Sequence, residues 1–130
     1  MSYYFGKKLR MPFDAAVESV TAGLAENGFG VLTTIDVGAT LRKKLGVDFR
    51  RYVILGACNP AFAYKALQTE DKIGTMLPCN VIVQELGDGW VEVAAVDPVA
   101  SMAAVRNPGL GAIAGEVRTL LSGVIADLRP

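Results

Sequence analysis

The feature that most limits the fold is a predicted β-hairpin in the second half of the chain. Two segments rich in β-branched and apolar residues, 79–86 and 90–96, flank the sequence Gly-Asp-Gly at 87–89. Asp88 and Gly89 suit a tight two-residue turn, because both residue types accept the positive φ angles that such a turn requires. A hairpin pairs its two strands antiparallel, so this part of the sheet is expected to be antiparallel.

Two long amphipathic helices are predicted, one near each end of the chain. Apolar residues from Phe13 to Leu24 recur at helical spacing, with Pro12 at the first turn and Gly28 as a stop. The second helix begins near Pro108, and its apolar residues follow one another at three- and four-residue steps. That stripe consists of Leu110, Ile113, Val117, Leu120, Leu121, Val124, Ile125 and Leu128.

The remaining segments predict three further strands and two shorter helices. The predicted strands are residues 3–9, 29–35 and 51–58, and the predicted helices are residues 36–45 and 60–69. We therefore expect a single α+β domain over residues 1–130, with a mostly antiparallel sheet and the two long helices packed on one face. The predicted core residues are Val17, Val20, Leu24, Ile54, Val81, Val93, Ile113, Val117, Leu120 and Val124.

Composition narrows the chemistry of the chain. Thirteen basic and thirteen acidic residues give zero net charge, which provides no long-range attraction for nucleic acid or an anionic membrane. The chain has no histidine, which excludes Ser-His-Asp and Cys-His catalysis within one chain. Two cysteines are too few for a closed zinc site unless a dimer supplies the remaining ligands, so we assign no metal ligands. A soft-metal site, with copper(I) or zinc on the two thiolates, is a weaker third alternative to the functions considered below. The sequence identifies no cofactor.

The sequence also predicts where the protein resides. The N-terminal segment MSYYFGKKLRMPFD has no apolar stretch before a small-residue cleavage site, so it does not resemble a signal peptide. No uninterrupted apolar run reaches the length of about 18 residues that a membrane span needs, so we expect no membrane partner. We expect a cytoplasmic protein whose two thiols are reduced.

The two cysteines share an unusual setting. Cys58 lies in LGACNP, residues 55–60, and Cys79 lies in LPCN, residues 77–80, so each is followed by an asparagine and each motif contains a proline. Cys58 ends one predicted strand and Cys79 begins another. If the two strands are antiparallel neighbours, both thiols lie at the same end of the sheet and line one pocket.

Two functions are compatible with these residues. In the first, Cys58, Asn59, Cys79 and Asn80 line the pocket of a non-enzymatic ligand-binding or sensor domain that takes a small molecule or an anion. In the second, one or both cysteines serve a thiol-dependent redox or conjugating enzyme. Asn59 starts a helix, whose free amides favour the thiolate form of the adjacent cysteine. Both cysteines are equally compatible with a purely structural role, because cysteine is among the most buried residue types.

Two further patterns leave alternatives open. Arg42, Lys43, Lys44, Arg50 and Arg51 form a basic cluster, which is either an anion site or the solvated face of a helix. Gly111 and Gly115 lie one turn apart on the final predicted helix, and small residues there allow either tight packing within the chain or a homodimer contact.

Several segments resemble one known family. ENGFGVLTTIDV, LGVDFRRYVILGACNPAFAYKAL, IGTMLPCNVIVQE and VAAVDPVASM follow one another in the order and spacing of the domain of unknown function 302 family. The most specific part of the resemblance is LGACNP followed by LPCN. The resemblance implies a small α+β domain and implies no activity, substrate or cofactor.

Overall fold

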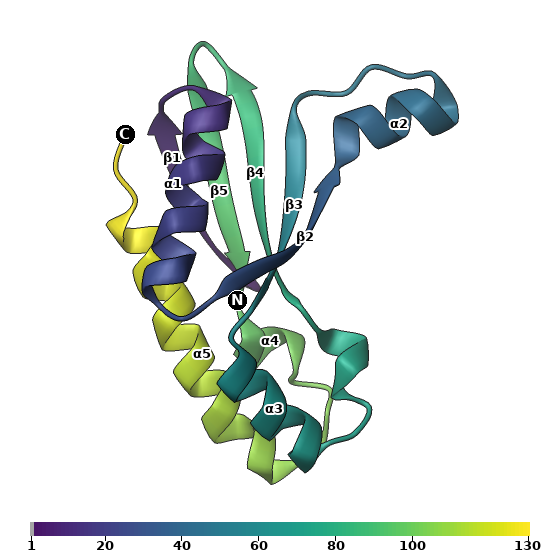
Figure 1. The fold of residues 1–130 in the computed structure, drawn as a ribbon, viewed down its shortest axis with the longest axis vertical. Coiled ribbons are helices and arrows are strands. Elements are labelled where there is room, and N and C mark those ends of the chain that lie inside the picture. Colours follow the sequence, from purple (N-terminus) through teal and green to yellow (C-terminus); the bar gives the residue numbers. More distant parts are fainter. Residues whose placement is uncertain (1) are drawn as a thin grey trace.

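A computed structural model describes residues 2–130 and has a single five-stranded sheet at its centre (Figure 1). The strand order is β1-β5-β4-β3-β2, and every neighbouring pair is antiparallel. The elements in chain order are β1 (Tyr4–Arg10), α1 (Phe13–Glu26), β2 (Gly30–Asp36), α2 (Val37–Leu45), β3 (Tyr52–Cys58), α3 (Pro60–Thr69), η1 (Ile73–Met76), β4 (Cys79–Gly87), β5 (Trp90–Val96), α4 (Pro98–Ser101) and α5 (Pro108–Asp127). The predicted α+β class and antiparallel sheet are confirmed.

The β4–β5 hairpin forms where the sequence predicts it. Asp88 has a φ of 55° and Gly89 a φ of 83°, as a tight turn of this kind requires. The pairing shifts by one residue between Glu85 and Gly87, so a bulge precedes the turn. The hairpin occupies the middle of the molecule, because β1 pairs with the outer side of β5 and β3 with the outer side of β4.

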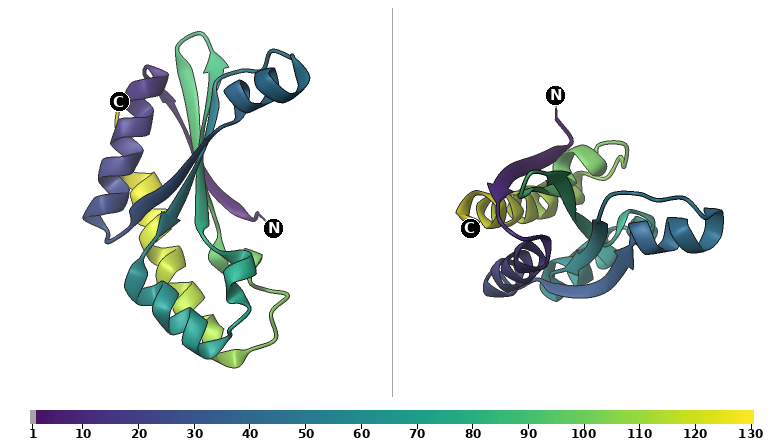
Figure 2. Two further views of the ribbon diagram at one scale, coloured as in Figure 1. Left: turned by 45° about the vertical axis from the view of Figure 1, so that its right-hand side comes forward. Right: turned by 90° about the horizontal axis from the view of Figure 1, so that it is seen from above.

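The long helices α1 and α5 lie against the same face of the sheet and contact each other, as predicted (Figures 1 and 2). Residues on that face alternate along each strand with residues on the other face. On β4, for example, Val81 and Val83 are buried, whereas Ile82 between them is only half-buried. Among residues 2–130, no helix covers the centre of the second face to the extent that α1 and α5 cover the first.

The predicted core is correct in part. Val20, Leu24, Val81, Val93, Val117 and Val124 are buried, but Val17, Ile54, Ile113 and Leu120 are only half-buried. Ile54 alternates with the buried Val53 and Leu55, so it lies on the more open face of the sheet. On α5 the fully buried residue is Leu121, because the buried face is centred one position further along than Leu120.

A second, smaller core lies beyond one end of the sheet. Ala66 of α3, Ile73 of η1 and Leu110 of α5 are buried together there. α5 thus spans both cores, with its first turns in the small one and its later turns in the large one. By length and composition α5 is also the one helix, among residues 2–130, that could cross a membrane. Its buried stripe against the sheet is typical of a core helix in a globular domain.

The α2 region projects away from the rest of the molecule at the far edge of the sheet (Figure 1). The helix starts and ends as predicted: the Asp36 side chain accepts a hydrogen bond from the Ala39 backbone N–H, and Gly46 adopts a left-handed conformation with a φ of 66°. None of the residues of α2 is buried. We call residues 37–51 the α2 arm.

Candidate functional site

A cavity of about 330 Å³ lies between the large and small cores. Its floor is the end of the sheet at which β2 begins, β3 ends and β4 begins, and helices α3, α4 and α5 form its walls. The lining residues are Phe29, Leu32, Thr33, Ala57, Cys58, Asn59, Phe62, Ala63, Ala66, Leu67, Leu77, Pro78, Cys79, Pro98, Met102, Ile113, Ala114 and Val117. None of these side chains is charged.

The antiparallel pairing of β3 with β4 brings the two cysteines to this cavity. Cys79 lies directly opposite Ala57, and Cys58 is the next residue along β3. Both are free thiols and both line the cavity, Cys58 half-buried and Cys79 buried. The sequence reasoning anticipated this arrangement, since it required only that the two strands be antiparallel neighbours.

The two thiols differ in their environment. Burial, and to a smaller extent the nearby Cys58 thiol, raises the pKa of Cys79 from its ordinary value to about 11. Desolvation disfavours a thiolate because the charged form loses its hydration. At neutral pH Cys79 is therefore a neutral, buried thiol that behaves as a small apolar side chain. Any thiol chemistry in the cavity would fall to Cys58.

The two asparagines are separated by the sheet. Asn59 lines the cavity at the N-cap position of α3, but its side chain makes no capping hydrogen bond. Instead its Nδ2 atom lies close to Gly28, which has a φ of 83°. Asn80 does not line the cavity, contrary to the grouping of all four Cys-Asn residues at one site. It follows Cys79 within a strand, so its side chain points to the opposite face.

On that opposite face Asn80 borders a separate trough of about 410 Å³. The trough is more polar than the cavity and includes Tyr4, Tyr52, Gln84 and Glu92. Gln84 is held in place there, since it accepts a hydrogen bond from Arg50 at 2.8 Å and donates one to Glu92 at 2.9 Å.

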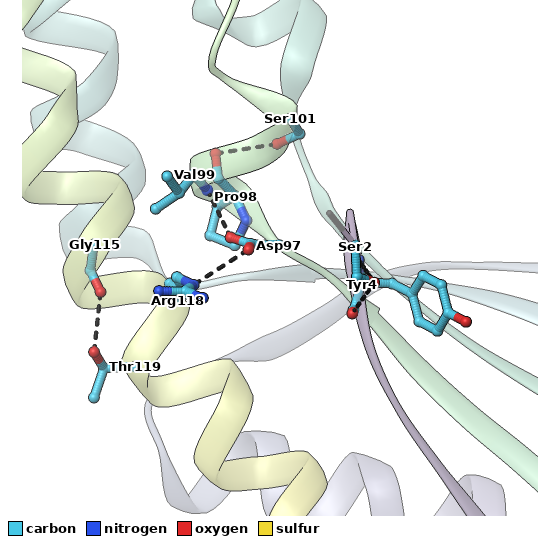
Figure 3. A network of polar contacts seen from close by, with 9 residues as sticks. All are labelled: Ser2, Tyr4, Asp97, Pro98, Val99, Ser101, Gly115, Arg118 and Thr119. Atoms are coloured by element: carbon cyan, nitrogen blue, oxygen red, sulfur yellow. Dashed lines mark hydrogen bonds and ion pairs between the residues drawn. The ribbon is translucent and has the colours of Figure 1, made fainter.

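An ion pair between the buried Asp97 and the exposed Arg118 positions one wall of the cavity (Figure 3). The Asp97 carboxylate accepts a hydrogen bond from the Val99 backbone N–H at 3.0 Å and contacts the Arg118 guanidinium at 3.2 Å. Asp97 is only 7% exposed, so it is a carboxylate that needs these partners. The contact joins α4 to α5 and thereby sets the position of Pro98, which lines the cavity.

A second polar contact fixes the far wall. Asn107 caps α5 by accepting a hydrogen bond from the Gly109 backbone N–H, and its side chain also donates to the Thr69 carbonyl at 2.9 Å. This contact ties the start of α5 to the end of α3. The start of α5 and the end of α3 lie so close together that a side chain at Gly109 would clash with Thr69.

The sequence contains a signal for these walls that a search for catalytic residues misses. Helices α3, α4 and α5 all begin with proline in the first turn, preceded by Asn59, Asp97 and Asn107 respectively. Proline at this position is favoured because the first-turn N–H has no helical partner. Three such starts define the three helices that enclose the cavity.

The floor of the cavity depends on one glycine. A side chain at Gly56 of β3 would clash with Thr33 of β2 and with Pro78, the residue before β4. Both of these neighbours line the cavity. Glycine is therefore needed at this point, where three segments approach one another more closely than side chains allow.

The lining limits what the cavity can do chemically. Thr33, Asn59 and the two thiols are its only polar side chains. Within residues 2–130 no three His, Cys, Asp or Glu side chains come together in a way that could hold a metal ion. The cavity thus offers a predominantly apolar surface with a hydrogen-bonding amide at Asn59.

The basic cluster lies away from this cavity, on and after α2. Arg42 forms an ion pair with Asp48 at 2.9 Å, and Arg51 forms one with Asp14 at 2.9 Å. All four side chains are largely exposed, so these pairs contribute little to stability. Because these side chains are exposed and no residue of α2 is buried, the cluster fits the alternative of a solvated helix face.

Comparison with known proteins identifies the family. A family model described as a domain of unknown function, DUF302, matches residues 5–128. The chain belongs to the DUF302 family. A crystal structure of an uncharacterized conserved DUF302 protein from Bacillus stearothermophilus is similar to it, with 26% sequence identity, a TM-score of 0.88, and coverage of 97% of this chain and 98% of that one. No curated protein sequence matches this DUF302 chain.

Proposed function

We propose that this DUF302 domain is a non-enzymatic binding or sensor domain for a small, mostly apolar molecule. The observation that carries the proposal is the cavity of about 330 Å³ whose lining is apolar apart from Thr33, Asn59 and two thiols. Its volume falls at the lower end of the range of small-molecule sites, about 300–1,000 Å³. Removal of the apolar surface of a ligand from water would make its binding free energy more favourable.

The polar groups of the lining favour a ligand with one hydrogen-bonding end. The Asn59 side chain makes no capping hydrogen bond at the start of α3, which leaves its amide available to a ligand. A carbonyl or hydroxyl group on the ligand could accept from or donate to it. No cationic side chain lines the cavity, which favours a neutral ligand over the anion considered from the sequence.

The thiol-dependent alternative rests on Cys58. This thiol is half-buried in the cavity at the start of α3, where the first-turn amides are free of helical partners. A conjugating reaction would need a base that takes the proton of the Cys58 thiol, and the lining supplies no carboxylate or histidine. The binding function requires none of these groups, and it is therefore the one we favour.

A cavity-filling substitution tests the proposal directly. Ala63 lines the cavity from α3, whereas Ala61 on the same helix is exposed and does not line it. We expect the neutral fluorescent probe N-phenyl-1-naphthylamine to bind the wild type, Ala63→Phe to weaken its binding at least tenfold, and Ala61→Phe to leave it within about twofold. Absence of binding by the wild type, or equal binding by Ala63→Phe, would rule out the cavity as the binding site.

A further inference from the structure

The apolar cavity contains one thiol that is accessible to a bound molecule and to water. Cys58 lines the cavity and is half-buried. Cys79 lines the same cavity but is only 9% exposed, and its raised pKa keeps it protonated at neutral pH. A thiol reacts as its thiolate, so Cys58 is the nucleophile that a molecule in this cavity meets.

Hydrogen-bond donors surround the backbone that follows Cys58. Helix α3 begins at Pro60, and the backbone N–H groups of its first turn have no helical acceptor. The Asn59 side chain does not cap them, and it lines the cavity with its amide. Donors of this kind stabilise negative charge that develops on a nearby oxygen atom. This end of the cavity therefore suits a ligand whose oxygen becomes negative when sulfur adds to it.

We propose that the ligand is a small apolar enone or enal, a carbonyl compound conjugated to a C=C bond, and that Cys58 captures it covalently. This inference rests on the proposed binding function and adds the chemical class of the ligand. The thiolate sulfur of Cys58 forms a C–S bond with the β-carbon, and the π electrons of the C=C bond move towards the carbonyl oxygen. Solvent takes the thiol proton before the addition and returns one to the α-carbon afterwards. The sum is the addition of S–H across C=C, with no leaving group, oxidant or reductant.

The lining favours this electrophile over other molecules that react with thiols. Large charged thiols and acyl carriers would bring charge to a cavity that has no charged side chain to receive it. A single addition needs no resident base, because solvent accepts the thiol proton, whereas catalytic turnover would need one. The reaction is therefore compatible with a lining that has no carboxylate or histidine.

The cavity walls predict how the reaction rate depends on the ligand. An apolar tail attached to the carbonyl group would contact lining residues such as Phe62 and Ala66 of α3 and Ile113 of α5. Each methylene group that leaves water makes binding more favourable. A longer tail thus raises the amount of ligand bound before the addition, and with it the rate at Cys58. A free thiol in water has no wall for the tail to contact.

Two vinyl ketones test this dependence, because oct-1-en-3-one and but-3-en-2-one differ only in the length of the alkyl tail. Mass spectrometry of the intact chain and of its peptides measures the rate of addition at each cysteine, and glutathione is the free-thiol reference. We expect the ratio of the long-tail rate to the short-tail rate to be at least about tenfold larger for Cys58 than for glutathione. Equal ratios for Cys58 and glutathione, or faster addition to Cys79 than to Cys58, would overturn the proposal.

Substitutions at the thiol and in the wall locate the reaction. Cys58→Ser should abolish the adduct, and peptide mapping of the wild type gives the same information without a substitution. Ala63→Phe, which fills the cavity, should lower the rate ratio to that of glutathione, whereas the exposed Ala61→Phe should leave it within about twofold. An adduct that persists in Cys58→Ser, or a ratio that Ala63→Phe leaves unchanged, would contradict capture by Cys58 in the cavity.

The saturated ketone octan-3-one separates covalent capture from the binding function on which it rests. This ketone has no C=C bond, so it reports reversible binding alone, and we expect it to displace N-phenyl-1-naphthylamine and to slow the addition of oct-1-en-3-one to Cys58. Displacement of the probe together with equal rate ratios for Cys58 and glutathione would overturn capture and leave the binding function standing. Absence of binding by both the probe and octan-3-one would overturn both.

Discussion

The two Cys-Asn dipeptides have the same sequence but different structural settings. Cys58-Asn59 marks the change from a strand to a helix, and both side chains line the cavity. Cys79-Asn80 lies inside a strand, so the cysteine faces the core and the asparagine faces the opposite side. A dipeptide thus directs its side chains to one site or to two, depending on whether the backbone turns between its residues.

The largest expected difference between the two motifs is in thiol reactivity. With a pKa of about 11 against an ordinary value of 9.0, Cys79 at pH 7 is in the thiolate form about 100-fold less than an ordinary thiol. We expect Cys58→Ser to abolish most fast labelling by a thiol reagent, and Cys79→Ser to leave most of it. Mass spectrometry of the labelled peptides measures both rates. Equal, slow labelling of the two cysteines would make both of them packing residues.

The raised pKa of Cys79 also predicts a pH dependence of stability. The Cys79 thiol ionises near pH 9 in the unfolded chain but near pH 11 in the folded one. Its contribution to the free energy of unfolding is therefore complete below about pH 9 and is lost as the pH rises to 11. The difference of two units between the folded and unfolded pKa values corresponds to about 2–3 kcal/mol of unfolding free energy.

Urea unfolding at pH 8 and pH 10.5 measures this contribution. Tyrosines and lysines titrate in the same window, so the comparison is between the wild type and Cys79→Ala, which lacks this ionisation. Cys58→Ala is the matched control and should retain the dependence. An identical loss of stability in the wild type and Cys79→Ala would contradict the burial of the Cys79 thiol.

The two faces of β4 should differ in what a truncation costs. Val81 follows Cys79 on the covered face and is fully buried, whereas Ile82 follows Asn80 on the open face and is half-buried. We expect Val81→Ala to lower the free energy of unfolding by about 2 kcal/mol, and Ile82→Ala to lower it by about 1 kcal/mol although it removes more atoms. Chemical denaturation measures both, and a larger loss for Ile82→Ala would mean that the open face is covered.

The smallest expected effect concerns the asparagines. If the Asn59 amide contacts the ligand, Asn59→Ala should weaken binding of a neutral probe that carries a carbonyl group, such as 6-propionyl-2-dimethylaminonaphthalene, by about 1 kcal/mol, the typical value of one hydrogen bond. Asn80→Ala should leave the affinity unchanged, because Asn80 lies on the other face of the sheet. Fluorescence titration separates the two variants, and equal effects would contradict the assignment of Asn59 to the cavity.

Local chemistry made the elements predictable. Asp88 and Gly89 mark the hairpin, Asp36 and Gly46 bound α2, and Pro60 starts α3, because turns and helix ends place specific demands on single residues. The proximity of Cys58 and Cys79 followed from one assumption about strand pairing. These features depend on short segments of chain.

Two of the features that the sequence did not predict depend on contacts between distant segments. A third was missed because the alternation of side chains along a strand was not applied to it. The pairing of β1 with β5 joins opposite ends of the sequence and leaves no local signature. The rotation of α5 that buries Leu121 in place of Leu120 is set by packing against the sheet. The position of Asn80, by contrast, was available from the sequence, since adjacent residues of one strand point to opposite faces.

The small core has a kinetic consequence for the cavity. Only Ala66, Ile73 and Leu110 are buried in it, so the lobe formed by α3 and η1 is held by far fewer apolar contacts than the sheet. Segments of this kind open by local unfolding more often than the whole domain does. A molecule bound beside Cys58 would contact this lobe through Phe62, Ala63 and Ala66, so local opening of α3 would speed its release. Hydrogen exchange of the α3 backbone amides measures how often this opening occurs.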